Sequence, residues 1–171
     1  MPVITRFAIP GDEALIADIS RKTFYETFAS QNTTENMNKF MDQQFTREAL
    51  MKEVIDPGNI FFLAYDADTP AGYVKMRERK DTAGAQHSGT IEIARIYVIT
   101  DAIGKGVGKV LMQKCIDIAI EKKKKNIWLG VWQENHRAIE FYTKWGFEKY
   151  GTQVFLLGDD PQTDWLMKKK L

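Results

Sequence analysis

The stretch that decides the fold reads Ile103-Gly104-Lys105-Gly106-Val107-Gly108-Lys109 and stands between a predicted strand and a predicted helix. Its glycines occupy alternate positions, so backbone N–H groups can approach a ligand closely. The start of the helix behind them adds the positive end of a dipole, and together these features favour a bound phosphate. The alternative is a tight turn that binds nothing, since short glycine-rich motifs match by chance.

Two common nucleotide-binding motifs do not fit this turn. A P-loop needs a glycine, four further residues and then Gly-Lys-Ser/Thr, but Ile103 stands at the first position and Val110 at the last. A dinucleotide fingerprint that starts at Gly104 needs its final glycine where Lys109 stands. Neither motif therefore identifies a ligand for the turn.

The segments around the turn alternate between strand and helix patterns. Thr90–Ile99 reads as a strand before the turn and Gly104–Lys125 as a helix after it, with an apolar stripe at helical spacing. Asn126–Trp132 is apolar on both faces, which predicts an interior strand covered by helices. Asn135 is a predicted N-cap, and Gly146 ends the helix that follows.

The remaining segments complete an α/β pattern with a mixed sheet. Helices are predicted from Ala14 to Phe28, around Met37 with Thr34 or Asn32 as cap, and over Arg47–Ile55. Lys80–Ser88 is predicted to be a surface loop. The other predicted strands are Val3–Ile9, Ile60–Tyr65, Ala71–Arg77, Phe147–Leu157 and Asp164–Leu171. A length of 171 residues predicts one domain over 1–171.

Composition excludes several classes of protein. Lys+Arg is 24 and Asp+Glu is 23, and this balance argues against a nucleic-acid surface. No run of apolar residues is as long as a membrane span, and residues 1–10 lack the pattern of a secretory signal. One cysteine and two histidines cannot form a Cys/His zinc site, so we expect no metal. The chain is expected in the cytoplasm, where a lone cysteine stays reduced.

A second motif gives the turn its context. The residues from 135 to 147 fit N-x-x-A-x-x-F-Y-x-x-x-G-F completely, and residues 103–108 follow Q/R-x-x-G-x-G/A except at Ile103. Together they resemble the GNAT family of acetyl-CoA-dependent N-acetyltransferases. The resemblance implies a GNAT-like mixed, mostly antiparallel central sheet flanked by helices. Residues 24–28, 126–132 and 158–164 are also similar to the PaiA-type spermine/spermidine acetyltransferases within that family.

The resemblance implies where acetyl-CoA would bind. Backbone groups of the strand Ile96-Tyr97-Val98 would hold the pantetheine arm and the acetyl carbonyl. The N–H groups of the turn would hold the pyrophosphate, and residues of the next helix would line the far side. The implied cofactor residues are Ile96, Tyr97, Val98, Gly104, Lys105, Gly106, Val107, Gly108, Lys109, Asn135, Ala138, Tyr142 and Lys144.

Two residues are candidates for proton transfer. Within the family motif, Tyr142 would donate a proton to the departing thiolate, whereas helical spacing alone favours a role in core packing. Glu92 would act as the base, because it stands four residues before Ile96 and strand alternation puts both on one face. The alternative is a solvated carboxylate, and a bulge between Glu92 and Ile96 would break the alternation.

Asp159, Asp160 and Asp164 form an acidic stretch that would attract a polycation, or else a solvated turn. The sequence therefore predicts transfer of an acetyl group from acetyl-CoA to a small amine, such as spermine or spermidine. Two alternatives stay open at this point: an acceptor that is a protein N-terminus or lysine, and a CoA-binding regulatory module without turnover. A second copy of the chain, in a homodimer, is a further candidate partner.

Overall fold

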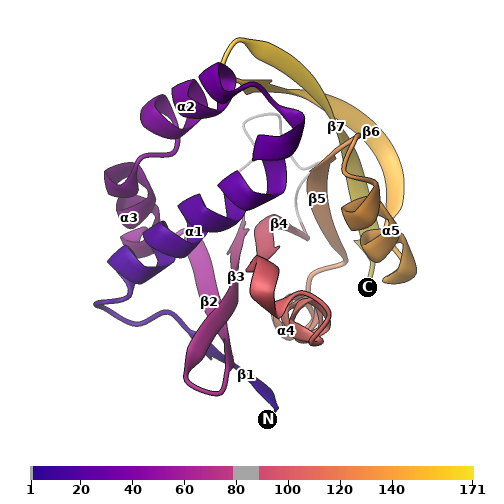
Figure 1. The fold of residues 1–171 in the computed structure, drawn as a ribbon. Helices are drawn as coiled ribbons and strands as arrows, with labels where there is room; N and C mark the ends of the chain where they lie inside the picture. Colours follow the sequence, from indigo (N-terminus) through magenta and orange to yellow (C-terminus); the bar gives the residue numbers. More distant parts are fainter. Residues whose placement is uncertain (1, 79–88) are drawn as a thin grey trace.

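The computed structural model describes residues 2–78 and 89–171, so the predicted loop Lys80–Ser88 lies outside the described residues. The described chain contains both strands and helices (Figure 1). In order they are β1 (Val3–Phe7), α1 (Glu13–Phe28), η1 (Ala29–Gln31), α2 (Thr34–Gln43), α3 (Arg47–Ile55), β2 (Asn59–Asp66), β3 (Thr69–Arg77), β4 (Thr90–Val98), η3 (Thr100–Ala102), α4 (Val107–Glu121), β5 (Asn126–Trp132), α5 (His136–Lys144), β6 (Glu148–Leu157) and β7 (Asp160–Lys170). Among these residues, no helix is long and apolar enough to cross a membrane.

The strands form one seven-stranded sheet in the order β1-β2-β3-β4-β5-β7-β6. Every neighbouring pair is antiparallel except β4 and β5, which run parallel. The crossover between these two strands contains α4, as a parallel connection requires. The mixed, mostly antiparallel sheet predicted from the sequence is therefore confirmed.

The parallel pair is joined only at one end. β4 and β5 pair over Thr90–Glu92 and Asn126–Trp128, and beyond these residues no pairing between the two strands is found. β4 nevertheless continues to Val98 and β5 to Trp132. The two strands therefore diverge into a V that is closed at Glu92 and open at the end where β4 leads to the glycine-rich turn.

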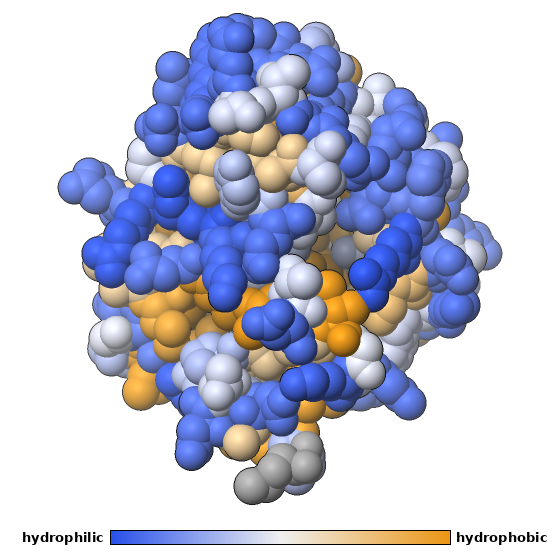
Figure 2. All heavy atoms as spheres, in the orientation of Figure 1, coloured by the Kyte–Doolittle hydropathy of each residue, from blue (hydrophilic) through white to orange (hydrophobic). Residues whose placement is uncertain are grey.

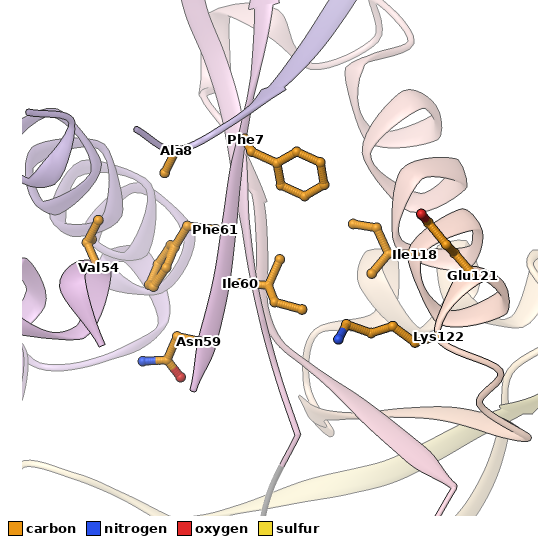
Figure 3. A pocket seen from close by; sticks show the side chains of 9 residues that line it. All are labelled: Phe7, Ala8, Val54, Asn59, Ile60, Phe61, Ile118, Glu121 and Lys122. Atoms are coloured by element: carbon orange, nitrogen blue, oxygen red, sulfur yellow. The ribbon is translucent and has the colours of Figure 1, made fainter. Parts of the chain in front are cut away.

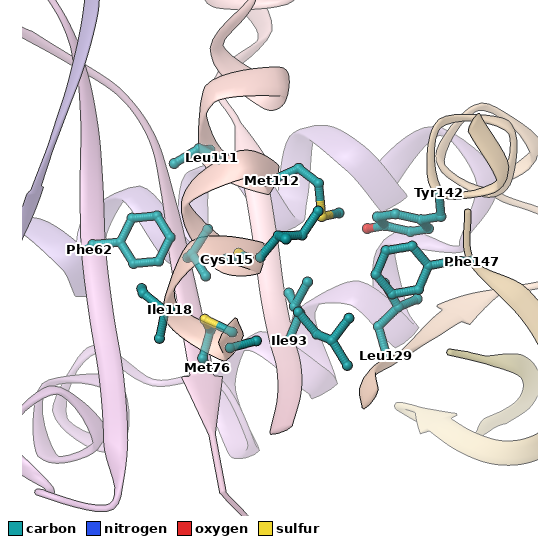
Figure 4. Packing of buried hydrophobic residues seen from close by; sticks show 14 of the residues in the cluster. Phe62, Met76, Ile93, Leu111, Met112, Cys115, Ile118, Leu129, Tyr142 and Phe147 are labelled. Carbon is teal, nitrogen blue, oxygen red and sulfur yellow. The ribbon is translucent and has the colours of Figure 1, made fainter. Parts of the chain in front are cut away.

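The two faces of the sheet are covered by different helices. On one face α4 packs into the main apolar cluster, which also takes residues from α5 (Figure 4). On the other face α1 contributes Ile16 and Ile19 to a cluster with Phe61, Leu63 and Tyr73 of the sheet. The helices α1, α2 and α3 lie together on this side (Figure 1). We call the two sides the α4 face and the α1 face.

Several predicted boundaries move by a few residues. α4 begins at Val107 rather than Gly104, because residues 104–106 form the turn itself. The N-cap of α2 is Thr33, whose hydroxyl accepts a hydrogen bond from the Asn36 N–H at 3.1 Å, and not Thr34 or Asn32. β7 begins at Asp160 rather than Asp164, so the β6–β7 hairpin is longer than predicted. The apolar segment of β5 is also less covered than expected, since Gly130 is exposed.

Candidate active site

The glycine-rich turn depends on backbone conformations that favour glycine. Gly104 and Gly106 have φ angles of 88° and 82°, in the left-handed region where a Cβ is strained. A Cβ added at either glycine would meet nothing within 4 Å, so the requirement is conformational and not one of space. Val107 starts α4 directly after the turn, and the first N–H groups of a helix have no intrahelical partner. The turn therefore presents free donors at the open end of the V.

The backbone of β4 also faces the V. The Ile99 N–H donates to the Ala71 carbonyl of β3 at 2.9 Å. Because alternate residues of a strand direct their N–H and C=O groups to the same side, Tyr97 also points toward β3. The backbone groups of Ile96 and Val98 therefore point toward β5, where the pairing has ended. This orientation is the one that the family resemblance implies for backbone groups expected to bind the pantetheine arm.

The turn, the end of β4 and the helix α5 meet at Gly108. A Cβ added there would lie 3.5 Å from Phe141 of α5 and 3.8 Å from Val98. Asn135 caps α5 by accepting a hydrogen bond from the Ala138 N–H at 3.3 Å. In the space-filling view, the surface is hollowed between the start of α4 and α5, over the V (Figure 2). The predicted cofactor residues of three elements thus lie around one recess.

The lysines predicted to bind the cofactor lie at its margins. Lys105 is exposed, with its Nζ 3.7 Å from the Asp66 carboxylate, and Lys109 is exposed on the first turn of α4. Lys144 lies at the last turn of α5, the end away from Asn135, and pairs with Glu140 at 3.2 Å. Each can contribute charge near the recess, but Lys144 is the farthest along α5 from the turn.

Tyr142 lies at the edge of the apolar cluster on the α4 face. Its ring packs beside Met112 and Phe147, and its hydroxyl points toward α4 (Figure 4). Burial raises the pKa of the Tyr142 phenol well above its usual value, and the nearby Cys115 thiol raises it further. The hydroxyl forms no hydrogen bond with another described residue. The group therefore stays protonated at neutral pH and its proton is not engaged elsewhere.

The alternation argument for Glu92 is wrong, because a bulge interrupts β4. Lys75 pairs with Arg95 and Met76 with Ile93, which leaves Ala94 as an extra residue. Ile93 and Ile96 consequently both face the cluster under α4. Glu92 therefore points to the α1 face, opposite to Ile96.

The Glu92 carboxylate is buried at the closed end of the V and pairs with Arg77. The Arg77 Nε donates to Oε1 at 2.5 Å and Nη2 donates to Oε2 at 3.4 Å. Both carboxylate oxygens therefore interact with one guanidinium group, so Glu92 is not the solvated carboxylate of the alternative. Its assignment as the base stays a prediction.

The three aspartates predicted to bind substrate occupy two places. Asp159 is exposed at the tip of the β6–β7 hairpin and pairs with Lys39 of α2. Asp160 is exposed beside it and accepts a hydrogen bond from Gln162 at 3.1 Å. Asp164 lies about 13 Å farther along β7 at roughly 3.3 Å per residue. There it is opposite Trp132, at the open end of the V.

Asp164 is half-buried on the α1 face. A Cβ added at Gly130 would lie 3.7 Å from its Oδ2 atom and 2.7 Å from the Gln153 amide nitrogen. Burial raises the pKa of the Asp164 carboxyl, and a hydrogen bond from Gln153 partly offsets this. The sequence suggested only the backbone of Tyr97 for the site. Its side chain interacts electrostatically with both Asp164 and Tyr142. The pattern of strand residues gave no signal for these contacts across β4, β5 and β7.

A polar group beneath α3 was also missed. Glu53 pairs with Lys75 at 3.3 Å and with Arg95. The Tyr73 hydroxyl and the Arg95 Nη1 are buried without a hydrogen-bond partner among the described residues. Lysine and arginine on a central strand read as exposed positions in the sequence, so no pattern indicated this cluster.

A cavity of about 500 Å³ lies apart from the V (Figure 3). Ile118, Glu121 and Lys122 line it from the C-terminal end of α4, roughly 20 Å along the helix from the glycine-rich turn at 1.5 Å per residue. Its other lining residues come from α3, β1 and β2 and the segments that flank them. No predicted site residue lines this cavity.

Known proteins of one family match this chain in sequence and in fold. The model of the acetyltransferase (GNAT) family matches residues 16–147. The chain is 39% identical over 158 residues to an uncharacterized N-acetyltransferase of Lactobacillus delbrueckii subsp. lactis, covering 90% of this chain and 88% of the relative. It is 25% identical over 171 residues to the spermidine N(1)-acetyltransferase of Thermoplasma acidophilum, covering 98% and 96%. The crystal structure of the PaiA N-acetyltransferase from Thermoplasma acidophilum in complex with coenzyme A superposes with a TM-score of 0.80 at 21% identity, covering 100% of both chains.

Proposed function

The chain belongs to the acetyltransferase (GNAT) family, and we propose that its 171 residues form one domain that acetylates a polyamine such as spermidine or spermine. Acetyl-CoA-dependent N-acetylation is the activity of this family. The identity of the amine is our proposal.

The residues around the V fit acetyl-CoA. The backbone N–H and C=O groups of Ile96 and Val98 face the gap and can pair with the amides of the pantetheine arm. The Lys105 N–H donates to the Ala102 carbonyl at 3.3 Å, and the other N–H groups from Gly104 to Lys109 can hold the pyrophosphate, where a helix N-terminus favours negative charge. The acetyl thioester that this cosubstrate supplies would then lie in the gap between β4 and β5, beside Ile96 and Val98. Tyr142 donates a proton to the departing sulfur.

The observation that carries the polyamine assignment is a carboxylate beside the V. Asp164 is half-buried at the open end, and within residues 2–78 and 89–171 it forms no ion pair. A half-buried carboxylate without a cation is stabilised when a ligand supplies one. Asp160, the first residue of the same strand, adds negative charge at the hairpin tip. A chain of several ammonium groups matches this spacing of charges, and one distant relative is a spermidine N(1)-acetyltransferase.

The test is the release of free CoA with a panel of acceptors at fixed acetyl-CoA. Spermidine and spermine should give the highest kcat/KM, and this preference should shrink as salt rises, because exposed charges are screened. The panel includes a monoamine, a lysine peptide and a peptide with a free N-terminus. An enzyme that acetylates the peptides well and the polyamines not at all would contradict the assignment.

A paired substitution separates the hairpin charge from general effects. Asp160→Asn should raise the KM for spermidine several-fold and leave the KM for the monoamine unchanged. The control is Glu148→Gln, which removes one exposed carboxylate at the far end of β6. Equal effects of both substitutions on spermidine would argue against a binding role of Asp160.

A further inference from the structure

The attacking amine must lose a proton, and the position of Glu92 makes it poorly suited to take it. Glu92 is at the closed end of the V, on the last residue of β4 that pairs with β5. Both of its oxygens interact with the Arg77 guanidinium. A carboxylate held in this way supports the junction of β3, β4 and β5. If the chain acetylates an amine, as proposed above, another group must receive this proton.

Asp164 occupies the opposite, open end of the V. Asp164 pairs with Trp132 of β5, so the two side chains lie on the same face of the sheet. The centroid of the Trp132 ring lies 5.9 Å from that of Phe28 in α1. Asp164 therefore lies on the α1 face. Tyr97 of β4 is opposite Tyr73, whose side chain packs with Ile16 and Ile19 of α1. Asp164 and Tyr97 therefore lie on the same face, on the two sides of the gap between β4 and β5.

The surroundings of Asp164 leave access for an amine. Gly130 of the adjacent strand is exposed and has no side chain to cover the carboxylate. The nearest cover is the amide end of Gln153, which belongs to a flexible and exposed side chain of β6. β5 otherwise presents the Trp132 ring. The titratable groups that interact with this region are the hydroxyls of Tyr97 and, from the α4 face, Tyr142.

The open V connects these groups. Tyr142 belongs to the α4 face and Tyr97 to the α1 face, yet the two hydroxyls interact electrostatically. β4 and β5 are not paired at the level of Tyr97. An acceptor on the α1 face can therefore reach a thioester that enters from the side of α4.

We propose that the Asp164 carboxylate, and not Glu92, accepts the proton of the acceptor amine. Asp164 takes one proton from the ammonium group and frees the nitrogen lone pair. The nitrogen then bonds to the acetyl carbon, the carbon–sulfur bond breaks, and Tyr142 gives its proton to the sulfur. The second amine proton restores the Tyr142 hydroxyl, and Asp164 releases its proton to solvent. Protons and charge balance without a further reactant.

The surroundings also suit Asp164 to the task chemically. Burial raises the pKa of its carboxyl, which makes the carboxylate a better proton acceptor than an exposed aspartate. No described cation opposes this effect through an ion pair. The hydrogen bond from Gln153 acts in the other direction and limits the rise.

The test is the pH dependence of kcat/KM for spermidine in Asp164→Asn, a substitution of nearly equal shape. The wild-type rate should level off well below the pKa of the amine, because the enzyme removes the proton. In Asp164→Asn the amine must lose its proton in solution, so the rate should rise about tenfold per pH unit toward that pKa. The loss near pH 7 should be about 10²-fold. For glycinamide, an α-amine of lower pKa, the loss should be smaller.

Three further variants make the result specific. Asp164→Glu keeps a carboxylate and should keep the plateau, even if Asp164→Asn proves unstable in a thermal melt. Glu148→Gln should behave as wild type. Glu92→Gln should lower stability and retain the plateau.

A uniform loss in Asp164→Asn at every pH, or a lost plateau in Glu92→Gln with an intact one in Asp164→Asn, would overturn the inference while leaving the proposed function in place. A wild-type protein that acetylates none of the amines would overturn both.

Discussion

The Tyr142 side chain is packed like a core residue but carries a hydroxyl that forms no hydrogen bond with another described residue. It is 9% exposed and contacts the main apolar cluster. Unlike the Tyr73 hydroxyl, the Tyr142 hydroxyl is not among the fully buried atoms without a partner in the described residues, so solvent or a ligand can reach it. The hydroxyl is therefore explained better by chemistry at the V than by its contribution to the core.

Tyr142→Phe should keep the fold and the affinity for CoA, and should lower the rate of acetyl transfer. The ring and its packing are retained, and only the proton is removed. General acid catalysis contributes about 10²–10⁴ in rate, and the moderate basicity of a thiolate places the loss at the lower end. Single-turnover rates are the appropriate measurement, because slow product release can hide a chemical step.

Tyr150→Phe is the matched control for this change, since Tyr150 is an exposed tyrosine on β6. It should transfer the acetyl group at the wild-type rate. If Tyr142→Phe also keeps the wild-type single-turnover rate from about pH 6 to about pH 9, Tyr142 is a core residue only.

At the scale of the element, the N-cap of α2 gives a direct test of how this helix begins. Thr33 has an extended backbone and its hydroxyl accepts from the Asn36 N–H, whereas Thr34 is already helical. Thr33→Ala should lower the free energy of unfolding by about 1 kcal/mol, the usual contribution of such a cap. Thr34→Ala should change it by only a few tenths, because alanine is a good helix former. Urea unfolding of both variants measures the difference.

Element boundaries also show which parts of the fold the sequence could predict. Periodicity located the helices and most strands, because their buried faces are continuous. The bulge at Ala94 carries no such signal. The extra residue places Glu92 and Ile96 on opposite faces of the sheet, although apolar and polar residues still alternate before and after it. The early start of β7 was missed because Asp160 and Pro161 disfavour strand, although here they pair across a hairpin at the edge of the sheet.

The candidate site was predicted in part for the same reason. Local motifs placed the turn and α5, whose backbone conformations and caps are set by nearby residues. The position of Asp164 beside Gly130 and its electrostatic interaction with Tyr97 depend on sheet order and on the divergence of β4 from β5. A single sequence does not contain that order.

At the scale of the whole molecule, the buried Lys75 links stability to pH. Burial lowers the pKa of Lys75 to about 8; the Arg95 charge lowers it as well, while Glu53 raises it in part. An unfolded lysine has a pKa of about 10.4. Between these two values the unfolded chain binds the proton that the folded chain has lost. The contribution of Lys75 to stability therefore increases as pH rises from about 8 to about 10.

Lys75→Met should remove this contribution. The free energy of unfolding of the wild type minus that of the variant should increase by about 1 kcal/mol per pH unit over this range. One proton corresponds to about 1.36 kcal/mol per pH unit, and screening reduces this value. Contributions from Cys115 and the buried tyrosines occur in both proteins and cancel in the difference. Lys52→Met, at an exposed position of α3, should show no such slope. A difference that is constant with pH in Lys75→Met would show that Lys75 is not buried as described.

In the proposed function the turn at the open end of the V binds the cosubstrate, and Gly106→Ala is the variant that tests this role. Gly106 and Gly11 both have positive φ angles, of 82° and 104°, and at both a Cβ would meet open space. Alanine therefore introduces similar backbone strain at either position, of roughly 1–2 kcal/mol. Only Gly106 lies in the turn that leads into α4.

Titration calorimetry with CoA measures the consequence without turnover. Gly106→Ala should weaken CoA binding by about tenfold or more, because strain at this residue displaces the N–H groups that hold the pyrophosphate. Gly11→Ala should bind CoA as the wild type does, despite a similar loss of stability. A folded Gly106→Ala protein with wild-type affinity for CoA would contradict the account, because the turn would then be a connection between β4 and α4 and not the binding site.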